Sequence, residues 1–325
     1  MMTTLYIDRR NLTLNTHGDA LTIHENDQHI NTLPLKIIER ICIHGDISLT
    51  AKVLGKLGDE NIGVMILSGR QQRPTLLMPN WKLDGKRRQM QYQQSQNAAF
   101  CQKLAEKLVL QKITQQIALL NEITPLSNQI DSLKQIATQI PFSMTINILR
   151  GLEGAAAAQY FGAWQDALPS SLQFSGRNRR PPRDPINSLL SLGYTLLHFE
   201  MVKHIQLCGL DPFIGFYHVA EHGRESLACD LLEPLRPEYD RWVLAQFRQQ
   251  TFRDHYFSTS AQGCTLQKAA RLRFYQEYEK WVKSWRVHIH ENCRGLLREL
   301  CPTAPELYSG SLKIIENDEE FDNFK

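Results

Sequence analysis

Three side chains in one stretch of the sequence have the types and spacing of a divalent-metal site. Asp230 and Glu233 are three residues apart, which places both carboxylates on one helix face, about a turn from each other. His218 lies fifteen residues before Glu233, about 22 Å along a continuous helix, so these groups meet only if the chain folds back. Gly215 and Gly223 supply breaks for such a fold. One imidazole with carboxylates can then hold Mn²⁺ or Mg²⁺, with water and phosphate in the open positions.

The same residues also have an ordinary structural interpretation. A single buried histidine more often bonds a backbone carbonyl, and His222 is as near to the carboxylates as His218. Upstream, Glu153 is the lone acid in a helical stretch of small and apolar residues that would allow close approach by another element. It is equally typical of an exposed glutamate on an alanine-rich helix. Spacing alone leaves both interpretations open.

Basic residues gather at two further places. A proline-stiffened loop between two predicted helices carries four arginines against a single acid, and a second basic run precedes the first long helix. Arginine can bind phosphate through two parallel N–H groups, which lysine cannot, although solvent-exposed charges and structural ion pairs are the plainer alternatives. The candidate DNA-binding residues, including two arginines beside the carboxylates, are Arg177, Arg179, Arg180, Arg183, Arg224, Arg236, Lys86, Arg87 and Arg88.

The elements that must position these residues fall into two regions. Residues 1–80 show short stretches of alternating apolar and polar residues separated by turn residues, with one helical stretch near Thr50 to Leu57. Residues 81–96 are basic and glutamine-rich, which predicts a linker. From residue 97 the apolar period changes to 3.6, with helices expected over 96–121, 126–140, 142–164, 187–207, 228–251 and 266–298. The expected fold is α+β, a small β-rich domain (1–80) followed by a larger all-α catalytic domain (97–315).

Composition excludes several classes of protein. The chain has 325 residues, 42% hydrophobic and 22% charged, which is typical of globular domains. No stretch approaches the roughly 18 uninterrupted apolar residues of a membrane span, and no secretory signal is visible, so the expectation is a cytoplasmic protein. The seven cysteines lack C-x-x-C spacing, which disfavours a disulfide frame or zinc ribbon. Residues 316–325 carry a net −4 and are expected to be a disordered acidic tail, so the rest carries +7.

Four motifs in a fixed order resemble the CRISPR-associated endonuclease/integrase family, Cas1. They are LRGLEGAAAAQYF at 149–161, GRNRRPPRDPINSLLSLGY at 176–194, GLDPFIGFYH at 209–218 and GRESLACDLLEPLR at 223–236. Tyr217 stands where the family suggests an aliphatic residue, and Glu225 where proline is frequent. The resemblance covers about residues 145–237. The β-rich start, the basic linker and the helical remainder match the two-domain layout of the family only in outline.

The resemblance implies a β-domain that dimerises and a helical catalytic domain with one Mg²⁺ or Mn²⁺ site. Its ligands and catalytic residues would be Glu153, His218 and Glu233, with Asp230 as an accessory acid. The implied activity is insertion of new spacers into CRISPR arrays, in which DNA 3′-hydroxyls attack phosphodiesters. The implied partners are double-stranded DNA, a second copy of the chain and the small protein Cas2, with no membrane.

Two alternatives remain open from the sequence. A metal-dependent DNA nuclease or junction resolvase needs the same site and differs only in using water as the nucleophile. A non-catalytic DNA-binding assembly subunit would use these residues only to brace helices. Intact acids at the matching positions disfavour the second.

Overall fold

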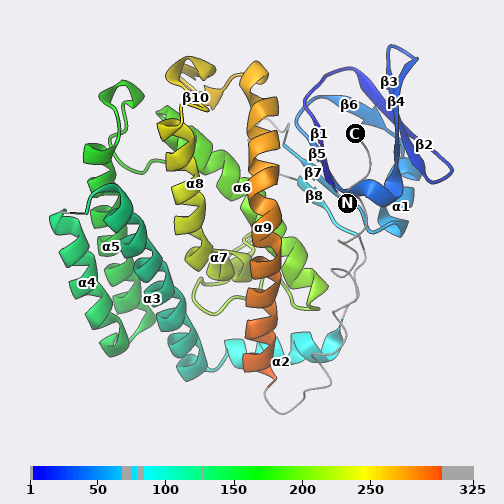
Figure 1. The fold of residues 1–325 in the computed structure, drawn as a ribbon. Helices are drawn as coiled ribbons and strands as arrows, with labels where there is room; N and C mark the ends of the chain where they lie inside the picture. Colours follow the sequence, from blue (N-terminus) through cyan, green and yellow to red (C-terminus); the bar gives the residue numbers. More distant parts are fainter. Residues whose placement is uncertain (1–2, 68–74, 80–83, 126, 180, 302–325) are drawn as a thin grey trace.

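The computed structural model describes residues 3–67, 75–79, 84–125, 127–179 and 181–301. A strand-rich N-terminal region lies beside a larger helical region, which confirms the expected α+β class (Figure 1). The N-terminal strands are β1 (Thr3–Ile7), β2 (Leu12–His17), β3 (Ala20–Glu25), β4 (Gln28–Pro34), β5 (Ile38–Ile43), β6 (Ile47–Leu49), β7 (Gly63–Ile66) and β8 (Thr75–Leu77). Helix α1 (Ala51–Asp59) is capped by Thr50, whose side chain accepts a hydrogen bond from the Val53 amide.

Two sheets form this region. In one, β1, β5 and β7 run parallel and β8 pairs antiparallel with β7; in the other the order is β4-β3-β2-β6. Strands β5 and β7 are largely buried, and their successive side chains point to opposite faces of the sheet. Ile41 and Val64 pack into the small N-terminal core, while Cys42 and Met65 join the core of the helical region. The two regions therefore share a packed interface.

The helical region comprises most of the remaining chain. Its helices are α2 (Gly85–Ser95), α3 (Ala98–Ile123), α4 (Asn128–Gln139), α5 (Ile146–Ala167), α6 (Pro185–Leu207), α7 (Ser226–Leu232), α8 (Arg236–Arg248) and α9 (Lys268–Leu300). In Figure 1, α3, α4 and α5 form one side of the bundle, and α9 runs along the side nearest the N-terminal strands, where it contacts β1. A hairpin of β9 (Phe257–Ser260) and β10 (Gly263–Leu266) interrupts the helices, where an all-α domain was expected. In the described part of the chain, no helix has the length and apolar character needed to cross a bilayer.

A buried charge cluster joins the two regions. Glu200 of α6 is fully buried and accepts hydrogen bonds from Arg40 of β5 and from Arg286 of α9, whose Nη2 lies 2.9 Å away. Lys203 of α6 pairs with Glu39 beside them. Burial alone raises the pKa of Glu200, but the two arginines hold it well below its usual range. This cluster fixes β5 against α6 and α9.

The stretch 81–96, expected as a basic linker, is helical over Gly85–Ser95, with residues 81–83 outside the described residues. Buried Gln91 of α2 donates to the carbonyls of Asp211 and Ile214, at 2.8 and 2.7 Å, and accepts from the Asp211 amide. The segment thereby braces the loop that leads to His218. The domain boundaries remain a prediction, and the acidic tail lies outside the described residues.

Candidate metal and DNA site

The two carboxylates of the DLLE motif lie where a helix is broken. One helix was expected over 228–251, but α7 ends at Leu232, a 3₁₀ turn spans Glu233–Leu235, and α8 begins at Arg236. Pro234 and Pro237 cause this break because a proline lacks the N–H that would continue the α-helical ladder. Glu233 bonds to Lys112 and Arg236, whereas Asp230 bonds to the loop that carries His218.

Asp230 organises the loop that carries His218. Its carboxylate is fully buried. One oxygen accepts the backbone N–H groups of Phe216 and Tyr217, at 2.7 and 3.0 Å. The other accepts the backbone N–H of His218 at 2.8 Å and contacts His218 Nδ1 at 2.7 Å. Because a carboxylate only accepts, the neutral imidazole donates from Nδ1 and keeps a lone pair on Nε2.

Glycine permits the close approach of this loop to α7. A Cβ on Gly215 would lie 2.8 Å from the Cβ of Ser226 and 2.9 Å from Asp230 Oδ2. Gly223, at φ +72°, makes the return turn. The chain thus folds His218 back over the start of α7, as the glycine spacing predicted. His222, the competing histidine, is exposed.

Lys112 of α3 joins Glu153 and Glu233. Its Nζ donates to Oε1 of Glu153, from α5, and to Oε2 of Glu233. Tyr217 donates its hydroxyl to Oε2 of Glu153, and Arg236 donates Nε to Oε1 of Glu233 at 3.0 Å. Both acids are therefore held from two sides in one short network.

The electrostatics of this network keep Glu233 and Lys112 in their charged forms. Burial alone raises the pKa of Glu233, but Arg236 and Lys112 hold it well below its usual range. Burial lowers the pKa of Lys112, and the carboxylates facing it outweigh that effect and raise it. Burial, followed by the charge of Glu153, raises the pKa of Tyr217. Glu233 is thus a carboxylate, and Tyr217 a hydroxyl donor, at neutral pH.

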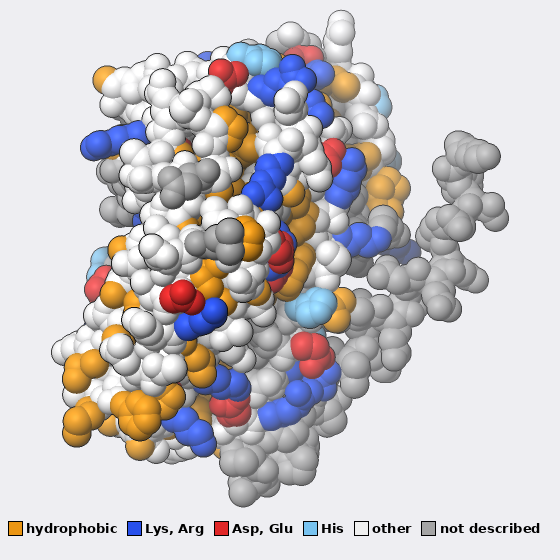
Figure 2. Space-filling model, turned by 60° about the vertical axis from the view of Figure 1, so that its left-hand side comes forward, with side chains coloured by type: hydrophobic (Ala, Val, Ile, Leu, Met, Phe, Trp, Pro, Cys, Tyr) orange, Lys and Arg blue, Asp and Glu red, His pale blue; other side chains and the backbone are white. Residues whose placement is uncertain are grey.

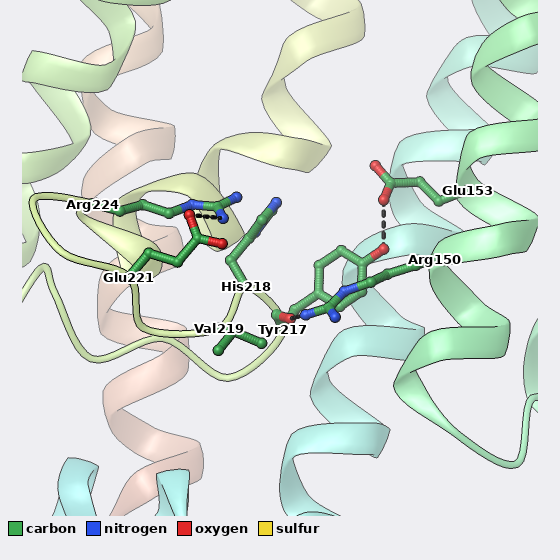
Figure 3. A pocket seen from close by; sticks show the side chains of 7 residues that line it. All are labelled: Arg150, Glu153, Tyr217, His218, Val219, Glu221 and Arg224. Carbon is green, nitrogen blue, oxygen red and sulfur yellow. Dashed lines mark hydrogen bonds and ion pairs between the residues drawn. The ribbon is translucent and has the colours of Figure 1, made fainter.

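A pocket of about 260 Å³ opens beside these groups (Figure 3). Glu153 and His218 face it, and the His218 ring points into the space between Arg224 and Glu153. Arg224 is paired with Glu221 at 3.3 Å. Arg150 donates to the Tyr217 carbonyl at 2.8 Å and lies against the Tyr217 ring. The pocket wall therefore carries an arginine and a glutamate on each side of the imidazole.

The donor chemistry fits a divalent ion. Glu153 and Glu233 each aim an oxygen at one cationic atom, the Lys112 nitrogen, and the His218 Nε2 lone pair remains available. Within the described ranges, no three or more His, Cys, Asp and Glu side chains converge closely enough to hold a metal, and the Lys112 ammonium stands between the two acids. The ligand assignment stays a prediction.

The candidate DNA-binding residues occupy different environments. Figure 2 shows basic side chains at several places along one face of the molecule. The arginine-rich loop follows a short 3₁₀ turn (Ser170–Leu172) and precedes α6. Arg180 lies outside the described residues. The exposed candidates are Lys86, Arg179 and Arg183; Arg88 is half-buried, and Arg224 lines the pocket.

Three other candidates are engaged inside the protein. Arg177 Nη1 donates to Asn187 Oδ1 at 2.7 Å, and its guanidinium lies 5.6 Å from the Tyr194 ring. The Arg236 guanidinium lies 4.6 Å from the centre of the same Tyr194 ring, and its Nε donates to Glu233. Arg87 pairs with Asp84 and donates to the Cys208 carbonyl. These contacts give the three arginines structural roles.

Sequence reasoning missed two members of the site. Lys112 continues the buried i, i+4 row of Leu104 and Leu108, and a lysine in such a row signals buried acids opposite. Tyr217 was noted only as a departure from the family pattern. Its hydroxyl bond to Glu153 links the histidine loop to α5, a contact between residues 64 positions apart.

Comparison with known proteins identifies a matching family, similar relatives and similar solved structures. The family described as CRISPR associated protein Cas1 matches residues 5–280. The CRISPR-associated endonuclease Cas1 1 of Thermodesulfovibrio yellowstonii is 37% identical over 313 residues, covering 92% of this chain and 98% of that protein. A casposase bound to integration product has a TM-score of 0.84 at 22% identity, over 99% and 96% of the two chains. A Cas6-RT-Cas1–Cas2 complex contains a chain with a TM-score of 0.81 at 22% identity, covering 94% of this chain and 36% of that one.

Proposed function

Because the chain belongs to the Cas1 family, we propose that it is a CRISPR spacer-acquisition integrase that joins the 3′-hydroxyl ends of DNA duplexes to a CRISPR array. The observation that carries the proposal is that Glu153 and Glu233, from two separate motifs, share the Lys112 ammonium, while Glu153 and His218 line one pocket. The 37% identical endonuclease and the casposase with its integration product support a phosphodiester reaction.

We propose that Glu153, His218 and Glu233 hold a Mg²⁺ or Mn²⁺ ion. When bound, such an ion polarises a phosphodiester and stabilises charge on its oxygens. Asp230 keeps His218 in the tautomer that presents Nε2. Arg150 and Arg224 line the same pocket and supply positive charge to a phosphate there.

We also propose that the exposed Lys86, Arg179 and Arg183 contact DNA phosphates, which gives affinity without sequence information. The proposed protein partners are a second copy of this chain and Cas2. The presence of Cas2 in the named complex with a chain of this fold supports the latter. The cytoplasm, where a CRISPR array lies, is the proposed compartment.

A joining assay tests the reaction. The full-length protein is incubated with Cas2, Mg²⁺ or Mn²⁺, a labelled duplex and a supercoiled plasmid that carries a repeat. The proposal predicts that label becomes covalently attached to the plasmid and that a dideoxy 3′ end blocks attachment. Equal plasmid nicking without donor or with dideoxy ends, and no attached label, would identify water as the nucleophile and favour the nuclease or resolvase. DNA binding without any cleavage would indicate an assembly subunit.

A further inference from the structure

Lys112 occupies the space between the two acids that the proposed function assigns to the metal. It lies on α3 one turn beyond Leu108, in a row of buried apolar residues, and is itself only 8% exposed. A lysine is rarely buried without partners, because an unpaired ammonium is costly to take out of water. The partners of its Nζ here are Oε1 of Glu153 and Oε2 of Glu233.

The network around Lys112 is balanced without a further cation. Tyr217 takes the second oxygen of Glu153, and Arg236 takes the second oxygen of Glu233. Two carboxylates therefore face two cationic side chains, and each of their four oxygens accepts a hydrogen bond. A divalent ion that binds both acids must compete for the oxygens that Lys112 already holds.

We propose that Lys112 is a built-in competitor of the divalent ion, which holds Glu153 and Glu233 together before metal binds and must leave them when it does. This inference rests on the proposed metal site. The ammonium is a compact charge on a flexible four-carbon stem, so it can withdraw without movement of α3. Metal affinity is then set partly by a residue that is not itself a ligand, and Lys112 raises the metal concentration that the site requires.

Direct Mn²⁺ binding tests this role. Free Mn²⁺ is measured by its electron paramagnetic resonance signal during titration of full-length wild-type, Lys112→Met and Lys107→Met proteins. Lys107 is the matched control because it lies on the same helix but pairs with Glu299 at the surface. The Lys112→Met protein should bind Mn²⁺ at least about tenfold more tightly, since a competitor with two charge-assisted hydrogen bonds is gone. Lys107→Met should match wild type.

A second readout follows the metal-free protein. Without Lys112 the two carboxylates repel each other, so Mn²⁺ should raise the unfolding midpoint of Lys112→Met by more degrees than that of wild type. If Lys112→Met does not fold, Lys112→Gln is measured instead. In the wild-type protein, moreover, Mn²⁺ should increase the reaction of Lys112 with an acylating reagent, followed by mass spectrometry.

The outcomes separate this inference from the proposed function. The competitor role is overturned, and the metal site stays in place, if the wild-type protein binds Mn²⁺, neither Lys112 variant binds it more tightly, and Mn²⁺ does not change the acylation of Lys112. Absence of Mn²⁺ binding at millimolar concentration in wild type and in the variants overturns both. Tighter binding in the Lys112 variants, with Lys107→Met unchanged, supports the inference.

Discussion

Replacement of Asp230 with asparagine tests how the histidine loop is held. The carboxylate accepts the N–H groups of Phe216, Tyr217 and His218 and the His218 ring N–H, all in a fully buried position. An asparagine keeps one accepting oxygen and turns an NH₂ group toward two of these donors. Each buried donor that loses its acceptor costs about 1 to 3 kcal/mol. We therefore expect the Asp230→Asn free energy of unfolding to fall by about 4 kcal/mol.

The side-chain flip has a chemical consequence as well. If the asparagine NH₂ faces the imidazole, it donates to Nδ1 of His218 and moves the ring proton to Nε2, the nitrogen that faces the pocket. DNA joining should then fall together with stability. Urea unfolding measures the first effect, with Asp211→Asn as control, because Asp211 accepts a single backbone N–H in an exposed setting. An Asp230→Asn protein within about 1 kcal/mol of wild type would refute the reasoning.

Three further predictions concern DNA, assembly and acid stability. Charge reversal at Arg179 and Arg183 should weaken duplex binding equally across sequences and lower the slope of log K against log salt by about 2; an unchanged slope would leave both as solvated charges. Ile30→Lys, on the exposed edge strand β4, should convert the proposed dimer to a monomer in light scattering, whereas an unchanged mass would place the contact elsewhere. The two arginines lower the pKa of buried Glu200, so this group should add stability above its unfolded pKa of about 4.3, and that stability should be lost as the pH falls. The Glu200→Gln protein should therefore be less stable at pH 7, and its free energy of unfolding in urea should depend less on pH. A parallel pH profile would refute this.

Much of the fold follows from local pattern. Apolar residues with a period of 3.6 predicted α3 and α9 to within a few residues, and alternation predicted strands such as β5. The break between α7 and α8 was not predicted, although Pro234 and Pro237 are visible in the sequence. The DLLE motif had been interpreted through helical spacing, and the two prolines outweigh that pattern.

The site was predictable where a motif carries it and not where distant segments meet. Glycine spacing correctly indicated that His218 folds back toward Asp230, because a close approach needs a residue without Cβ. The pairing of Lys112 with Glu153 and Glu233 joins three helical segments far apart in the chain, which no local period records. Arg236 was predicted to contact phosphate, but it is bonded to Glu233, three residues before it, in an i, i+3 pair of the kind that local spacing can indicate.

The most direct test of the account compares Glu153→Gln, His218→Asn and Glu233→Gln with wild type in the joining assay. The two glutamine changes keep the side-chain volume and remove the carboxylate charge, and His218→Asn removes the Nε2 lone pair. With Mn²⁺ present, each variant should join labelled duplex to plasmid at least about a hundredfold more slowly, while its duplex affinity should stay near that of wild type. Joining by Glu233→Gln at the wild-type rate would contradict the assignment of the metal site.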